Sequence, residues 1–178
     1  MKSKVVFIFL VLFFTLSFNS LTLHAQVKDT VTVIPYSQTV TNSWSGPNHP
    51  DALKLKAEAE QKCSEAVSDI ETRLLHLSLK FWGFNPRLIK ITPRVELFSG
   101  GIDRDFLGYR CSIKLESQSL DYTMLESDSE VKDQRRECYP IVDRNEKNRD
   151  VLYQELRSGW AIIGGHWCQV HLVELIQR

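Results

Sequence analysis

The sequence has no excess of charge of either sign, since 22 of its 178 residues are Lys or Arg and 22 are Asp or Glu. Without a net positive field to attract phosphates, a strongly basic nucleic-acid-binding protein is excluded. Glycine and proline are scarce, at 8 and 6 residues. These low counts exclude a collagen-like chain and a disordered tail. The composition, 43% hydrophobic and 25% charged, is that of an ordinary globular protein.

Long hydrophobic runs are also scarce, and Val5–Phe14 is the one unbroken run of ten residues. It follows Lys2 and Lys4, and Leu23-His24-Ala25 then fits a cleavage site. This pattern predicts a secretory signal peptide over residues 1–25. The alternative, an uncleaved anchor, is disfavoured because a membrane span needs about 20 apolar residues. We therefore expect a soluble protein in the periplasm or outside the cell, with no integral membrane span after cleavage.

The predicted mature chain, residues 26–178, has 153 residues. Cleavage removes two lysines and no acid, so 20 basic and 22 acidic residues remain. That length suits a single domain. Its most polar stretch is 117–150, where 15 of 34 residues are charged, nine acidic and six basic. We expect one α+β domain that carries a charged, solvated excursion at about 117–150.

The periodicity of apolar residues predicts the order strand, long helix, strand, strand, short helix, strand, strand. The strands are expected at 27–40, 87–98, 106–115, 160–163 and 166–176, and the helices at about 50–82 and between Asn148 and Gly159. Leu75, Leu79 and Trp82 widen the apolar stripe of the long helix. Pro35 indicates a sheet edge or a bulge. The order resembles the split βαβ, ferredoxin-like arrangement: an antiparallel sheet with both helices on one face and an extra C-terminal strand.

Four cysteines lie in the mature chain, at Cys63, Cys111, Cys138 and Cys168. In an oxidising compartment an even number suggests two disulfides, and three pairings are possible. Cys63 on the buried helical stripe and Cys111 on the core face of its strand favour Cys63–Cys111, with Cys138–Cys168 as the second pair. A four-cysteine zinc site is the alternative, but no two ligands are close in sequence, as structural zinc sites usually require. No C-x-x-C motif indicates a redox centre.

Motifs of catalysis are missing as well: there is no G-x-S-x-G, no H-E-x-x-H and no phosphate loop. His166 and His171 are five residues apart on one predicted strand, so they face opposite sides and cannot chelate one metal. Four acidic residues could pair for acid–base work or bind calcium, but we interpret them as a solvated loop: Glu126, Asp128, Glu130 and Asp133. We predict no catalytic residue, no metal and no cofactor.

The binding candidate is Trp44, in a polar loop where a tryptophan either covers the core or contacts a partner. The hypothesis is a non-catalytic protein-binding or envelope-associated module, whose partner adds a strand to the edge at 27–40. The alternative is a secreted hydrolase with an unrecognised site, which needs a deep pocket that brings one histidine to one acid, from among His166, His171, Asp103 and Glu174.

Overall fold

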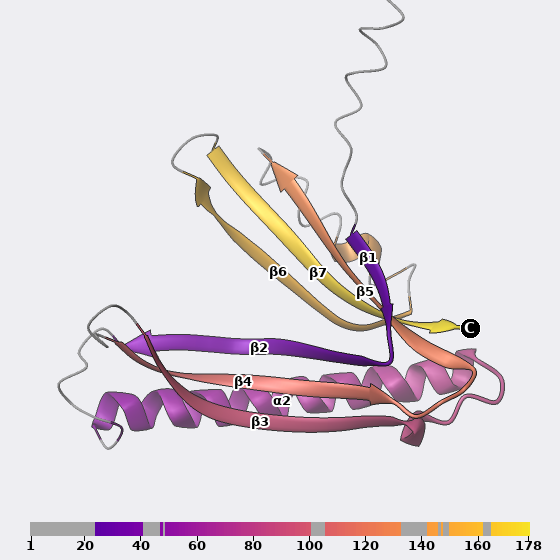
Figure 1. Cartoon of the computed structure of the whole chain (residues 1–178), viewed down its shortest axis with the longest axis horizontal. Helices are drawn as coiled ribbons and strands as arrows, with labels where there is room; N and C mark the ends of the chain where they lie inside the picture. The colour runs from indigo at the N-terminus through magenta and orange to yellow at the C-terminus, as the bar shows by residue number, and fades with distance from the viewer. Residues whose placement is uncertain are drawn as a thin grey trace, which may run out of the picture.

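The computed structural model describes residues 24–40, 47, 49–100, 106–132, 142–145, 147, 150–161 and 165–178. These residues form two antiparallel sheets, one long α-helix, a short 3₁₀ turn and a short helical segment at 142–145 (Figure 1). The predicted α+β class with antiparallel strands and one long helix is therefore confirmed. The two sheets meet at one end of the helix and diverge from there, as Figure 1 shows.

The first sheet has three strands in the order β2-β4-β3, and the helix α2 lies across one face. Its strands are β2 (Thr30–Val40), β3 (Ile89–Gly100) and β4 (Phe106–Ser117). Cys111, Ile113 and Leu115 alternate along β4 and are fully buried against the helix. The predicted hairpin of residues 87–98 and 106–115 is confirmed, because β3 and β4 pair along their length.

Helix α2 runs without a break over Pro50–Lys80, close to the predicted 50–82. At its start the His49 side chain accepts a hydrogen bond from the Asp51 N–H at 3.3 Å, and Pro50 occupies the first turn, where a missing N–H costs nothing. Gly83, just beyond the end, has a φ of 87°, which a residue with a Cβ rarely adopts. Six small or apolar side chains of the helix are buried: Ala52, Ala59, Cys63, Ile70, Leu74 and Leu77.

The second sheet has four strands in the order β1-β5-β7-β6. They are β1 (His24–Lys28), β5 (Tyr122–Lys132), β6 (Val151–Ala161) and β7 (Gly165–Gln177). The predicted short helix between Asn148 and Gly159 is wrong, because most of that stretch is β6. Leu152 and Tyr153 are buried in the main core while β6 pairs with β7. Pairing with a long neighbouring strand overrides the weak helical pattern of this segment.

The ferredoxin-like arrangement is not confirmed. It requires one sheet with two helices on a face, whereas the described residues form two sheets and α2 is the long helix packed on them. Two differences account for this. The second predicted helix is strand β6, and the first predicted strand is divided at Asp29 into β1 and β2, which join different sheets.

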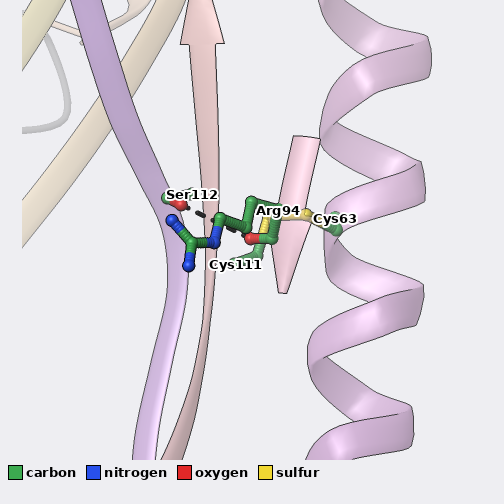
Figure 2. Close-up of a disulfide and its surroundings, with 4 residues drawn as sticks. All are labelled: Cys63, Arg94, Cys111 and Ser112. Carbon is green, nitrogen blue, oxygen red and sulfur yellow. Dashed lines mark hydrogen bonds between the residues drawn. A yellow bond between two sulfur atoms is a disulfide. The ribbon is translucent and has the colours of Figure 1, made fainter. Parts of the chain in front are cut away.

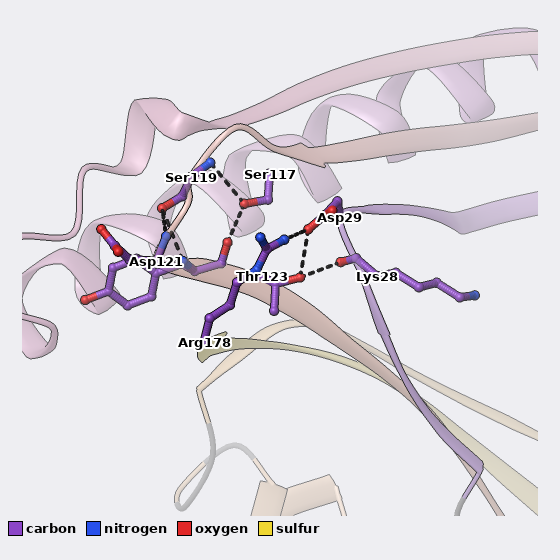
Figure 3. Close-up of polar contacts among 8 residues, drawn as sticks. Lys28, Asp29, Ser117, Ser119, Asp121, Thr123 and Arg178 are labelled. Atoms are coloured by element: carbon purple, nitrogen blue, oxygen red, sulfur yellow. Dashed lines mark hydrogen bonds and ion pairs between the residues drawn. The ribbon is translucent and has the colours of Figure 1, made fainter.

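The two sheets meet at a corner where the chain passes from β1 to β2 and from β4 to β5 (Figure 3). The buried Thr123 hydroxyl lies within hydrogen-bond distance of the Lys28 carbonyl at 3.0 Å and of an Asp29 carboxylate oxygen at 3.1 Å. The Arg178 guanidinium forms an ion pair with the same carboxylate. Ser119 accepts the N–H groups of the turn before β5, both at 3.2 Å. Polar contacts thus hold the corner closed at both crossings.

Two local predictions have different outcomes. The bulge indicated by Pro35 is confirmed, because the pairing of β2 with β4 shifts register between Val33 and Tyr36. In the sequence, Gly164-Gly165 between the two last predicted strands also predicts a two-residue hairpin turn that places Ile163 opposite His166. The observed register shows that this prediction is wrong. Residue 160 is the partner of His166, and Gly165 already belongs to β7. Residues 162–164 lie outside the described part of the chain.

Candidate functional site

The outer face of α2 changes character along its length. Its first part is polar and bears ion pairs between side chains three or four residues apart, including Lys54–Glu58, Lys56–Glu60 and Lys62–Glu65. A shallow hollow on this face is lined by polar residues alone: Gln61, Ser64, Glu65, Ser68, Asp69 and Thr72. Hydrogen bonds from Lys62 and then Gln61 lower the pKa of Glu65 below its ordinary value. This part of the helix is an ordinary solvated surface.

The last part of the same face is apolar. Leu75 and Leu79 are four residues apart on the helix and so share one face, and Trp82 follows two residues past the end of the helix. Their exposed fractions are 62%, 86% and 101%. We call these three residues the α2 ridge. The prediction that they widen the buried stripe is wrong, because Leu74 and Leu77 already fill the core at this end of the helix.

One more large exposed apolar residue lies at the same end of the molecule as the end of α2. Leu120, in the turn between β4 and β5, is 86% exposed. In Figure 1 this turn, the end of α2 and the C-terminus gather at one end. Just beyond the helix, Phe81 and Phe84 pack on Tyr122, with ring centroids 5.6 and 5.0 Å apart. Phe81 and Phe84, which precede and follow Trp82 in the chain, are therefore packed against the core.

The chain around the ridge has no acidic residue. Between Thr72 and Val95 the sequence has no Asp or Glu, and it has five basic residues, Arg73, Lys80, Arg87, Lys90 and Arg94. Some of these charges are paired with acids elsewhere in the chain, such as Lys80 with Asp150. The Arg87 side chain is exposed and has no ion-pair partner among the described residues. The other four basic residues each have a carboxylate partner: Arg73 with Asp69, Lys80 with Asp150, Lys90 with Glu116 and Arg94 with Glu96.

Charged residues also gather on the second sheet, around His171. Its Nδ1 lies 2.8 Å from Asp128 Oδ1, and its Nε2 lies 3.7 Å from Glu126 Oε1. Glu126 in turn forms an ion pair with Lys28 of β1. Asp128 and Glu155 are the Cα partners of His171 on its two neighbouring strands. Asp128, His171 and Glu155 therefore form a row across three strands on one face.

This row corrects the interpretation of the acidic residues. Glu126 and Asp128 lie on strand β5 and contact a histidine, so they do not form a solvated loop. The side chain of Glu130 and all of Asp133 lie outside the described residues. Beside the row, Tyr153 packs on His171 with ring centroids 6.1 Å apart. Burial and then the Glu155 charge raise the pKa of the Tyr153 hydroxyl far above its ordinary value.

The predicted hydrolase pairing does not match this arrangement. Glu174 is three residues from His171 on the same strand, so the two side chains face opposite sides of the sheet. A hydrolase histidine needs a nucleophile at one nitrogen and an orienting acid at the other. Here carboxylates lie near both nitrogens of His171. Asp103 and the side chain of His166 lie outside the described residues.

A disulfide joins helix α2 to the central strand of the first sheet. Cys63 of α2 and Cys111 of β4 form a disulfide with their Cα atoms 5.4 Å apart (Figure 2). Both residues are buried. Cys168 is also disulfide-bonded, and its predicted partner Cys138 lies outside the described residues. No described cysteine has a free thiol.

The remaining site prediction, Trp44, lies outside the described residues. Sequence reasoning missed that the α2 ridge is exposed, because an apolar pattern along a helix does not show which of its residues the core buries. It also missed the pairing of His171 with Asp128, which joins residues 43 positions apart. The described residues contain no group of three His, Cys, Asp or Glu side chains that could hold a metal ion.

Within the described residues, no helix is both long enough and apolar enough to cross a membrane. Gln154, on the edge strand β6, keeps a buried side-chain oxygen that has no hydrogen-bond partner among the described residues.

Comparison of the chain with protein-family models, with curated proteins and with solved structures finds no match in any of the three.

Proposed function

We propose that the protein is a secreted or periplasmic, disulfide-stabilised binding module that acts without catalysis and attaches to the cell envelope. The leader pattern of residues 1–25 supports export. The buried disulfide between Cys63 and Cys111 supports an oxidising compartment, where such bonds persist.

The α2 ridge is the observation that carries the proposal. Large apolar side chains that lie next to one another and point into water mark an interaction site, since isolated ones are ordinary but gathered ones are rare on monomers. Leu79 and Trp82 are almost completely exposed, while the neighbouring face of the same helix is fully packed. We propose that the partner covers this ridge.

The edge of strand β2 is a second candidate contact, to which a partner could add a strand. β2 pairs with β4 on one side only, within the described residues. However, Pro35 and the bulge beside it interrupt the edge that an added strand would follow, and such features protect edges from pairing. The ridge is therefore the better supported contact surface.

Fractionation of cells that export the protein tests this proposal. We expect the wild type to lack residues 1–25 by mass and to remain with the envelope fraction. The double substitution Leu79→Ser and Trp82→Ser should release most of the protein into the soluble fraction. Leu53→Ser is the matched control, because Leu53 is a half-exposed leucine at the opposite end of α2. A double variant that stays with the envelope would contradict the proposal.

A further inference from the structure

We infer that a second copy of this chain pairs with the outer edge of strand β3 and forms a symmetric dimer. The inference goes beyond the proposed function and does not depend on the α2 ridge. In this dimer the two β3 strands run antiparallel, so the first sheets of both copies join into one continuous sheet. Three features of β3 support it: an open edge, a charge pattern that complements itself and an exposed leucine.

The outer edge of β3 is long and uninterrupted. Among the described residues β3 is paired with β4 on one side only, and this pairing continues without a register shift from Ile89 to Gly100. Pro93 does not break that ladder, as expected of a proline on an edge strand whose missing N–H points away from the sheet. The edge of β2, in contrast, is interrupted by a bulge. Figure 1 shows β3 on the side of the first sheet away from the second sheet, which therefore does not cover this edge.

The charges on β3 select one way for two copies to pair. Arg94 and Glu96 lie on the face opposite the helix, because their partners on β4 alternate with the buried Cys111. When two β3 strands run antiparallel about Val95, Arg94 of each copy lies opposite Glu96 of the other. Pairing about Arg94 or about Glu96 would instead place like charges opposite each other, which is destabilising. Charge complementarity thus favours the register centred on Val95.

Both charged groups are placed to make this contact. Within its own chain Arg94 Nε lies 3.7 Å from Glu96 Oε2, and the Arg94 side chain stays 75% exposed. Glu96 Oε1 accepts a hydrogen bond from Arg110 Nε at 2.7 Å, which orients the carboxylate. An exposed ion pair as loose as that of Arg94 contributes little to stability. The Arg94 guanidinium can therefore exchange it for the same carboxylate of the second copy at little cost.

The helix face of the same edge is apolar and fits the same register. Val95 lies opposite its own copy, and Leu97 lies opposite Pro93 of the second copy. Leu97 is 45% exposed, although its partner on β4 is the buried Tyr109. Val95 packs against the main core. The added strand would cover Leu97 and extend the apolar contact of Val95 across the dimer, as burial of apolar surface favours.

Sedimentation equilibrium of the purified, oxidised protein tests the inference. We expect the wild type to dimerise reversibly as its concentration rises. Arg94→Glu should raise the dissociation constant of the dimer about tenfold or more, because it places glutamates opposite each other at two symmetric positions. Lys114→Glu is the matched control, since Lys114 is an exposed lysine on the central strand β4 and not at the edge. This same reversal of charge should leave the dissociation constant unchanged.

A mixture of two variants gives a sharper test. Glu96→Arg alone places arginines opposite each other and should weaken the dimer as Arg94→Glu does. An equimolar mixture of the two variants should dimerise like the wild type, because each glutamate then lies opposite an arginine. A wild type that is monomeric at every concentration, an Arg94→Glu variant that dimerises like the wild type, or a mixture of folded variants that stays monomeric would overturn the inference. Thermal melts confirm folding, and the exposed Arg94→Glu variant remains decisive if Glu96→Arg does not fold.

Discussion

At the scale of single residues, the contact between Tyr36 and Glu58 links strand β2 to helix α2. The Tyr36 hydroxyl donates to Glu58 Oε2 at 3.0 Å. Burial, followed by this hydrogen bond and the Glu58 charge, raises the pKa of Tyr36 from 10.0 to about 12. Since the folded pKa lies above the ordinary value, the neutral hydroxyl stabilises the fold fully below pH 10. That contribution is lost as the pH rises through 12.

We expect the substitution Glu58→Gln to lower the pKa of Tyr36 toward its ordinary value. The glutamine oxygen keeps an acceptor for the hydroxyl, while the negative charge that opposes ionisation is removed. An ultraviolet titration of tyrosinate absorbance measures the shift, and subtraction of the Tyr36→Phe variant isolates this one tyrosine. Glu60→Gln is the control, because Glu60 lies two residues further along α2 and is exposed. An unchanged titration in Glu58→Gln would show that Glu58 does not act on Tyr36.

At the scale of elements, the disulfide joins the centre of α2 to the central strand of the first sheet. Cys63 and Cys111 are 48 positions apart, and both are buried in the main core. In Figure 2 the bond bridges helix and strand beside the contact of Ser112 with Arg94. A crosslink of this length mainly restricts the unfolded chain, and so stabilises the packing of helix on sheet.

The double substitution Cys63→Ala and Cys111→Ala should lower the free energy of unfolding by about 4 kcal/mol, as loop-closure entropy for a crosslink of this span implies. Urea unfolding followed by circular dichroism measures the loss. Ser112→Ala, next to the bridge, should change stability by less than about 0.5 kcal/mol, because its hydroxyl makes a long contact at an exposed position. An unchanged urea midpoint in the double variant would disprove a stabilising role for the bond.

At the scale of the whole molecule, the corner decides how the two sheets are placed. β1 and β2 are consecutive in the chain, yet they pair with different strands of different sheets. Thr123 is almost fully buried at this crossing and contacts the backbone of one strand and the Asp29 side chain between the two strands. The corner also positions the turn of Leu120 beside the end of α2, and thus shapes the proposed binding end (Figure 1).

Thr123→Val should destabilise the protein by about 0.5–1.5 kcal/mol, because the isosteric change removes the hydrogen bond that the buried Thr123 hydroxyl makes at the corner. Thermal or urea unfolding measures the effect. Thr32→Val is the matched control, since Thr32 is exposed on β2 and valine suits a strand. Equal losses in the two variants would mean that the corner hydrogen bond contributes nothing.

Local signals in the sequence were enough for the long helix, the bulge at Pro35 and the hairpin of β3 with β4. Each depends on periodicity, on proline and glycine, or on residues close in the chain. Tertiary structure alone decided that Val151–Ala161 is a strand, because its apolar residues suit either element until β7 lies beside it. It also decided that Asp128 meets His171 and that Leu79 and Trp82 face water. A stripe pattern cannot tell how much apolar surface the core has room to bury.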